Sequence, residues 1–140
     1  MYYLKAQASF DAAHFLAGYE GKCRNIHGHH WIVEVRVCSE ALQSDGQERG
    51  MLIDFSCLKS DLKAIADELD HTLIYETGTL RPATLQCLRE EDFALTEVSF
   101  RPTAENFAKY LFDRMTAFGY HTAEVTVYET PNNCASYTQA

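Results

Sequence analysis

Residues 2–10 alternate between apolar and polar side chains, which predicts a β-strand with one face against a core and the other turned outward. A second run, 27–38, is rich in valine and isoleucine and predicts another strand. The polar turn 41–50 and the segment GMLIDF predict a third strand, over 50–55, that pairs back as a hairpin. We therefore expect an antiparallel sheet with one apolar face. The apolar positions of the first strand are Tyr2, Leu4, Ala6, Ala8 and Phe10.

Two helices are expected to cover that face. Asp54 can accept hydrogen bonds from the free N–H groups at the start of a helix, and apolar residues follow it at helical spacing as far as Asp70 and His71. A second helix is expected to begin at Thr103 and to end at Gly119. A last strand is expected over 123–129. The apolar positions of the two helices are Leu58, Leu62, Ile65, Ala66, Leu69, Phe107, Leu111, Met115 and Phe118.

The segment 72–102, between the helices, leaves two interpretations open. It is either a short helix over TLRPATLQCLREED followed by a strand over FALTEVSF, or an irregular insertion. In either case the order of elements predicts an α+β fold in a single domain, 1–140, with an antiparallel sheet and two helices on one face. Since no helix is left to cover the other face, we expect an oligomer to cover it.

Charge and cysteine content exclude several classes of protein. A formal net charge of −8 argues against a broad nucleic-acid surface, although a local cluster such as Lys22 and Arg24 can bind an anionic small molecule. There is no apolar run of about 18 residues and no secretory signal pattern, so we expect a cytoplasmic protein without a membrane span. Five cysteines without a CxxC spacing argue against a disulfide framework and against a four-cysteine zinc site.

The HGH motif at 27–29 is the strongest candidate for chemistry. Side chains alternate along a strand, so His27 and His29 share one face and His30 lies on the other. Catalytic zinc sites use three protein ligands and keep a fourth position open. His14, near the end of the first strand, is the best candidate for the third ligand. A hydrogen-bonded structural role is the competing interpretation, and the motif alone does not decide between them.

Two further groups leave several roles open. Cys23 lies in a loop between Lys22 and Arg24, where positive charge lowers the pKa of a thiol. It can be a zinc ligand, a base, or a residue without a role. Asp70 precedes His71 after the first helix, and such a carboxylate can orient an imidazole for acid/base work. The same histidine can equally be a favourable charge at the end of a helix.

Two glutamates complete the set of candidates. The alternation along the last strand puts Glu129 on its apolar face, where a carboxylate needs a partner such as a ligand with paired N–H donors. The alternative is a strand end that has already returned to solvent. Glu105 lies in the first turn of the second helix, where a carboxylate interacts favourably with the helix dipole.

Together these motifs resemble the 6-pyruvoyl-tetrahydropterin synthase family, and especially its bacterial 6-carboxytetrahydropterin synthase branch. The three-residue gap between Cys23 and HGH is similar to the bacterial branch, and the segment 72–102 is longer than the family minimum. The resemblance covers almost the whole chain. It rests on FDAAH at 10–14, Cys-x3-HGH at 23–29, IDF at 53–55, LDH at 69–71, PTAEN at 102–106 and VYET at 127–130.

The resemblance implies the tunnelling fold, with four antiparallel strands and two helices per subunit. Three subunits would form a barrel, and two barrels would pair into a hexamer. It also implies zinc as the cofactor. The residues implied as zinc ligands are His14, His27 and His29.

The resemblance assigns roles to the remaining candidates as well. Cys23 would accept a proton, and Asp70 with His71 would form a second proton-handling group. Glu129 would anchor the pterin and join the proton relay. The residues implied at the pterin pocket are Thr103 and Glu105.

The implied activity is that of a zinc-dependent lyase in queuosine biosynthesis. Its substrate would be 7,8-dihydroneopterin triphosphate, and its products 6-carboxy-5,6,7,8-tetrahydropterin, acetaldehyde and triphosphate. One alternative is a sibling enzyme of the same fold, which makes a pyruvoyl product or cleaves dihydroneopterin for folate synthesis. Another is a non-catalytic binding module that holds zinc, against which Cys23, Asp70 and His71 argue.

Overall fold

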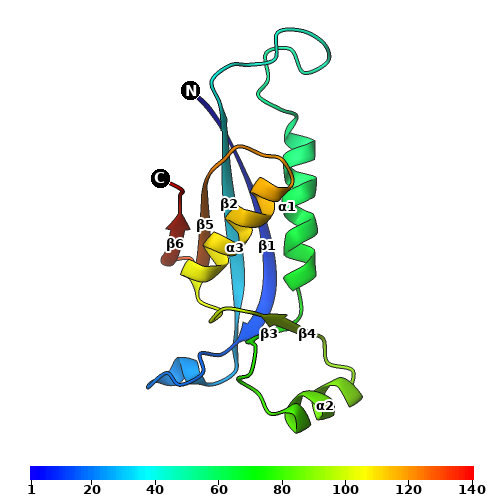
Figure 1. Cartoon of the computed structure of the whole chain (residues 1–140), viewed down its shortest axis with the longest axis vertical. Coiled ribbons are helices and arrows are strands. Elements are labelled where there is room, and N and C mark those ends of the chain that lie inside the picture. Colours follow the sequence, from blue (N-terminus) through cyan, green and yellow to red (C-terminus); the bar gives the residue numbers. More distant parts are fainter.

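The computed structural model describes all residues, 1–140, and contains one mixed sheet of six strands in the order β4-β3-β1-β2-β5-β6. Two long helices lie on the same side of this sheet, and a third, shorter helix lies beyond its end (Figure 1). In chain order the elements are β1 (Tyr2–His14), a 3-10 turn (Lys22–Arg24), β2 (His27–Ser39), α1 (Phe55–Leu69), β3 (Leu73–Glu76), α2 (Pro82–Glu90), β4 (Leu95–Val98), α3 (Ala104–Ala117), β5 (Thr122–Thr130) and β6 (Asn133–Tyr137).

The antiparallel pair of β1 and β2 forms the centre of the sheet. Both strands have 13 residues, and their register runs without a break from the pair Tyr2 and Ser39 to the pair His14 and His27. The expected first strand is therefore confirmed and extends four residues beyond 10, as far as His14. This register brings His14, the histidine of FDAAH, directly opposite His27, the first histidine of HGH.

The helices begin where the sequence predicts. The Asp54 carboxylate accepts a hydrogen bond from the N–H of Ser56 at 2.8 Å, and the Thr103 hydroxyl accepts one from the N–H of Asn106 at 3.3 Å. Gly119, at φ 101°, follows the end of α3 in a conformation that favours glycine. The expected apolar stripes are buried against β1, β2 and β5, except for Phe118, which is 48% exposed.

The expected strand over 50–55 is wrong. Residues 51–54 are irregular, and α1 begins at Phe55. Two backbone hydrogen bonds close the preceding loop on itself, from Gln43 N–H to the Met51 carbonyl and from Gly50 N–H to the Gln43 carbonyl, both at 2.9 Å. Leu52 still packs into the core, so its apolar character comes from burial in a loop and not from strand pairing.

The expected four-stranded antiparallel sheet is also incomplete. The segment 72–102 forms β3, α2 and β4, which is the helix-and-strand interpretation with one additional strand before the helix. Both strands are parallel to their neighbours, because β3 pairs with the end of β1, and β4 pairs with β3. A last short strand, β6, pairs with β5 and was not expected. The fold class, α+β with two long helices on one face, is confirmed.

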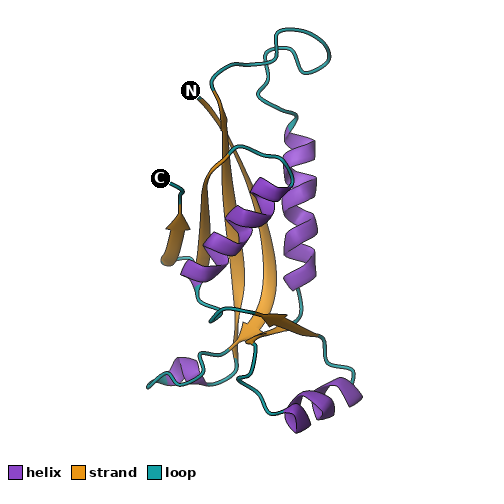
Figure 2. Cartoon of the chain, viewed as in Figure 1, coloured by secondary structure: helices purple, strands orange, loops and turns teal.

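The two faces of the central sheet differ in composition. One packs on α1 and α3 through a cluster of 22 buried residues (Figure 2). On the other, β1, β2 and β5 carry the ion pairs of Lys5 with Glu34 and of Arg36 with Glu124. No helix of the chain is long and apolar enough to cross a lipid bilayer.

Candidate metal centre

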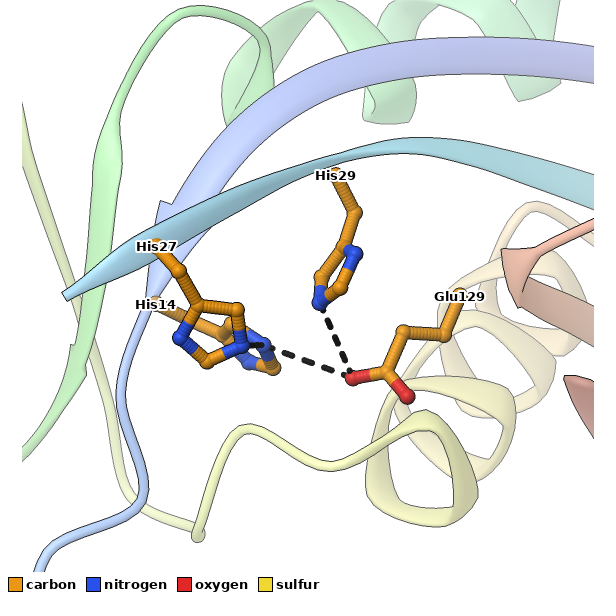
Figure 3. A group of neighbouring side chains, drawn as sticks. All are labelled: His14, His27, His29 and Glu129. Atoms are coloured by element: carbon orange, nitrogen blue, oxygen red, sulfur yellow. Dashed lines mark hydrogen bonds and ion pairs between the residues drawn. The ribbon is translucent and has the colours of Figure 1, made fainter. Parts of the chain in front are cut away.

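Three histidines meet at the end of the β1–β2 pair, on the face that the helices cover. His14 ends β1, while His27 and His29 begin β2, and their rings lie 4.6 to 5.1 Å apart between centroids. The buried Trp31 packs edge-on against His14 and His29 and forms the inner wall of the group. Figure 3 shows the three imidazoles pointing toward one another and toward Glu129 of β5.

Backbone carbonyls fix the orientation of two of these rings. The Nδ1 atom of His14 lies 2.7 Å from the carbonyl oxygen of Pro102, and that of His27 lies 2.7 Å from the carbonyl of Asn25. Because a carbonyl can only accept, each Nδ1 carries the hydrogen, and each Nε2 of a neutral ring is left with a lone pair. These two Nε2 atoms are only 3.2 Å apart. Two lone pairs at that distance repel unless a cation lies between them.

Glu129 adds a carboxylate to the group. Its Oε1 lies 3.4 Å from Nε2 of His14 and 3.3 Å from Nε2 of His29 (Figure 3). Nε2 of His29 is buried and makes no hydrogen bond. A β-bulge between Tyr128 and Thr130 interrupts the pairing of β5 with β6 at this residue, and bulges commonly redirect a side chain. The structure thus places Glu129 on the apolar face of β5, beside the histidines.

Burial keeps the rings in the form that a metal requires. It lowers the pKa of His14 to about 4, against the opposing effect of the Pro102 carbonyl and with a further lowering by His27 and His29. It also lowers the pKa of His29, while the Glu129 carboxylate acts in the opposite direction. Since metal ions bind neutral imidazole, these rings are available as ligands well below neutral pH.

The group fits a tetrahedral metal ion. One ligand atom from each of the four residues lies within 4.8 Å of every other. For zinc–nitrogen bonds of about 2.0 Å, tetrahedral geometry puts ligand atoms about 3.3 Å apart. The observed separations of 3.2, 3.3 and 3.4 Å match this value. Three imidazoles and one carboxylate are therefore a donor set that could hold a metal ion.

Cys23 is not among the grouped atoms. It lies in the 3-10 turn Lys22–Arg24, half-buried, and its thiol makes no hydrogen bond. The same loop supplies the Asn25 carbonyl that orients His27. The sequence left Cys23 three roles: zinc ligand, base, or none. Because the four grouped ligand atoms come from other residues, the structure gives no support to the role of zinc ligand.

Asp70 and His71 form the expected pair, with Oδ2 of Asp70 2.8 Å from Nδ1 of His71. The hydrogen bond to Asp70 and its negative charge raise the pKa of His71. The Asp11 backbone N–H and then His71 lower the pKa of Asp70. His71 lines a cavity together with Asp11, Ala13 and His30, whose side chains lie on the face of the sheet opposite the histidine group. Of the metal group only His29 also borders this cavity, and no hydrogen bond or ion pair joins Asp70 or His71 to the metal centre within one chain.

The PTAEN segment reaches the centre through its backbone. Thr103 caps α3 and Glu105 lies in its first turn, and neither side chain makes a hydrogen bond or ion pair with the histidine group. The orienting groups that sequence reasoning missed are the carbonyls of Pro102 and Asn25. Every residue has a backbone carbonyl, so the sequence does not show which carbonyls orient the histidines. Only the structure shows that those of Pro102 and Asn25 lie beside His14 and His27.

Known proteins match the chain over nearly its whole length. A family model described as 6-pyruvoyl tetrahydropterin synthase matches residues 3–140. The chain belongs to the 6-pyruvoyl tetrahydropterin synthase family. A relative from Haemophilus influenzae named 6-carboxy-5,6,7,8-tetrahydropterin synthase is 35% identical over 144 residues, with 98% of this chain and 99% of that protein covered. A relative of the same name from Synechocystis is 33% identical, with 83% and 98% covered.

Two solved structures have the same fold as this chain. An uncharacterized protein from Wolinella succinogenes superposes with a TM-score of 0.81 at 23% identity, over 99% of this chain and 98% of that one. The 6-pyruvoyl tetrahydropterin synthase of Caenorhabditis elegans superposes with a TM-score of 0.69 at 23% identity, over 99% and 96%. These likenesses confirm the expected tunnelling-fold class.

Proposed function

We propose that this chain is a zinc-dependent lyase that converts 7,8-dihydroneopterin triphosphate and one water molecule into 6-carboxy-5,6,7,8-tetrahydropterin, acetaldehyde and triphosphate, in queuosine and deazapurine biosynthesis. The observation that carries the proposal is the cluster of His14, His27 and His29, in which backbone carbonyls leave the Nε2 atoms of His14 and His27 with lone pairs beside Nε2 of His29, in a chain whose relatives bear the name of this synthase. These three residues would hold the zinc. When bound, zinc supplies a Lewis acid that lowers the pKa of hydroxyl groups.

The residues of the chain divide the remaining work between them. Cys23, in a loop with two basic neighbours, accepts a proton from the side chain of the substrate as a thiolate. His71, which Asp70 keeps charged to higher pH than usual, returns a proton to it. Glu129 turns from the imidazoles to accept the paired N–H donors of the pterin ring, and its half-exposed position leaves it free to do so. Thr103 and Glu105, at the start of α3, border the pterin.

The reaction requires neighbouring copies of the chain. In one chain the metal-centre side chains and the Asp70–His71 pair lie on opposite faces of the sheet, and of the metal group only His29 also borders the His71 cavity, so we infer that a substrate at the centre meets the Asp70–His71 pair of another copy. No helix of the chain covers the face of the sheet on which His71 lies, so another copy of the chain can pack there. Both edge strands, β4 and β6, are also unpaired on their outer sides and can pair with a neighbouring copy. We therefore infer a homo-oligomer, a trimer or hexamer, in which the metal centre of one copy faces the Asp70–His71 pair of the next.

Product analysis tests the proposed reaction. Zinc-loaded protein is incubated with 7,8-dihydroneopterin triphosphate, and the products are separated and identified by mass spectrometry. Acetaldehyde and the 6-carboxy product in equal amounts support the proposal. A pyruvoyl-type enzyme would release triphosphate but no acetaldehyde, and a non-catalytic zinc module would leave the substrate intact. Either of these results would contradict it.

A further inference from the structure

A second carboxylate–imidazole pair lies beside the first. His30, which follows the HGH motif, has its Nδ1 2.9 Å from Oδ1 of Asp11, the residue opposite it on β1. Both side chains are more than half exposed, at 59% and 56%, on the face of the sheet that no helix covers. Nothing in the metal centre or in the α1–α3 core uses this pair.

Asp11 joins the two pairs through its backbone. Its N–H donates to Oδ1 of Asp70 at 2.8 Å, and its carbonyl accepts from the N–H of His71 at 2.6 Å. These bonds hold His71 at φ 56°, a conformation that is uncommon outside glycine. One residue of β1 thus anchors Asp70 and His71 with its main chain and His30 with its side chain. The two imidazoles are placed relative to each other by rigid elements.

Both imidazoles line the same cavity, of about 700 Å³. Apolar side chains line other parts of the cavity, among them Ile26 before β2, Leu88 of α2 and Phe93 before β4. Phe93 and Ile26 are 59% and 61% exposed, so these apolar side chains are accessible to a ligand in the cavity. In the oligomer proposed above, this cavity faces the metal centre of the next copy.

The hydrogen bond to Asp11 decides which atom of His30 remains for a ligand. An ionised carboxylate can only accept, so Nδ1 of His30 carries a hydrogen and Nε2 is the free atom. A hydroxyl group both donates and accepts, so it can pair with Nε2 whether or not that atom carries a hydrogen. The apolar walls suit the carbon atoms that bear such a hydroxyl group and disfavour a phosphate group.

We propose that His30 is a further substrate-contacting residue, whose Nε2 hydrogen-bonds a hydroxyl group on the side chain of the pterin, and that Asp11 is the residue that positions it. This inference rests on the proposed function. It assigns His30 the task of orienting the side chain of the substrate, while His71 exchanges the proton. Discrimination between pterins with and without side-chain hydroxyl groups would then depend on His30.

Binding measurements test this assignment without turnover. Zinc-loaded wild type and variants are titrated by calorimetry with 7,8-dihydroneopterin, whose side chain carries hydroxyl groups, and with 6-methyl-7,8-dihydropterin, whose side chain carries none. His30→Ala is expected to weaken the binding of 7,8-dihydroneopterin by about 3- to 10-fold, the usual effect of one net hydrogen bond. It should leave the affinity for the methyl compound unchanged. His30→Gln, which retains a hydrogen-bonding group, should recover part of the loss.

Asp11→Ala is expected to have the same selective effect as His30→Ala, and the double variant should be no weaker than either single one, because the residues act as a unit. The matched control is His121→Ala, at an exposed loop position outside the cavity. Equal losses for both ligands, or none for either, would overturn the role of His30 while the proposed function stands. A wild-type protein that binds neither pterin would overturn both.

Discussion

Histidines on the two faces of the sheet have pKa values shifted in opposite directions. On the helix-covered face, backbone carbonyls hold His14 and His27, and burial lowers the pKa of His14 to about 4. On the uncovered face, the Asp70 carboxylate holds His71 and raises its pKa. A neutral ring with an outward lone pair suits a metal, whereas a ring that holds its proton suits acid catalysis. Burial on the covered face and a carboxylate partner on the uncovered face therefore separate the two functions.

The largest loss of turnover is expected from removing a metal ligand on the helix-covered face. His27→Ala should empty the metal centre and reduce turnover by about 10⁴-fold or more, because several kcal/mol of metal catalysis are lost at 1.36 kcal/mol for each factor of ten. Zinc content by elemental analysis should fall from about one per chain to near zero. His30→Ala, one residue beyond the motif on the other face, is the control and should retain its zinc. Equal loss of zinc in both variants would contradict the division between faces.

Cys23 tests whether the metal and the base are separate. Because its thiol is not among the four grouped ligands, Cys23→Ala should keep its zinc. Turnover should fall by roughly two to four orders of magnitude, the usual contribution of a positioned general base. The measurement is zinc content together with kcat. Loss of zinc along with the thiol would make Cys23 a ligand and contradict its assignment as base.

Glu129 tests what the carboxylate beside the imidazoles contributes. Glu129→Gln keeps the size of the side chain but replaces one acceptor oxygen by a donor, which opposes the N–H donors of a pterin. The loss of a charged hydrogen bond of about 1.5–3 kcal/mol should lower kcat/KM by roughly ten- to a few hundredfold. Zinc should remain, since three imidazoles suffice. Unchanged pterin affinity and turnover would mean that Glu129 has no part in binding.

The smallest expected change is a displacement of the pH profile. Asp70 raises the pKa of His71, so His71 keeps its proton to higher pH, and a step that needs this proton is lost as pH rises through the raised value. Asp70→Asn removes the charge, so the alkaline limb of kcat/KM should move to lower pH. Asp67→Asn, at an exposed carboxylate paired with Lys63 on α1, should not move it. An unmoved limb in Asp70→Asn would separate His71 from the acid step.

Periodicity and capping residues were sufficient to predict β1, β2, β5, α1 and α3, because each has a long pattern or a clear start. They failed at 50–55, where Leu52 is buried without strand pairing, and at β6, which is short and mostly exposed. Strand parity placed His27 and His29 together and His30 apart. The pairing of His30 with Asp11 depends on the register of two strands, which a single sequence does not determine.

We expect the two faces to work together only between copies of the chain. Mixing two inactive variants tests this most directly: His27→Ala lacks the metal centre, and His71→Ala lacks the acid. After joint unfolding and refolding in equal amounts, about one site in four should combine an intact centre with an intact acid. Activity should therefore recover to about a quarter of the wild-type value. No recovery from correctly refolded mixed oligomers would show that each chain must supply both parts itself, and would contradict it.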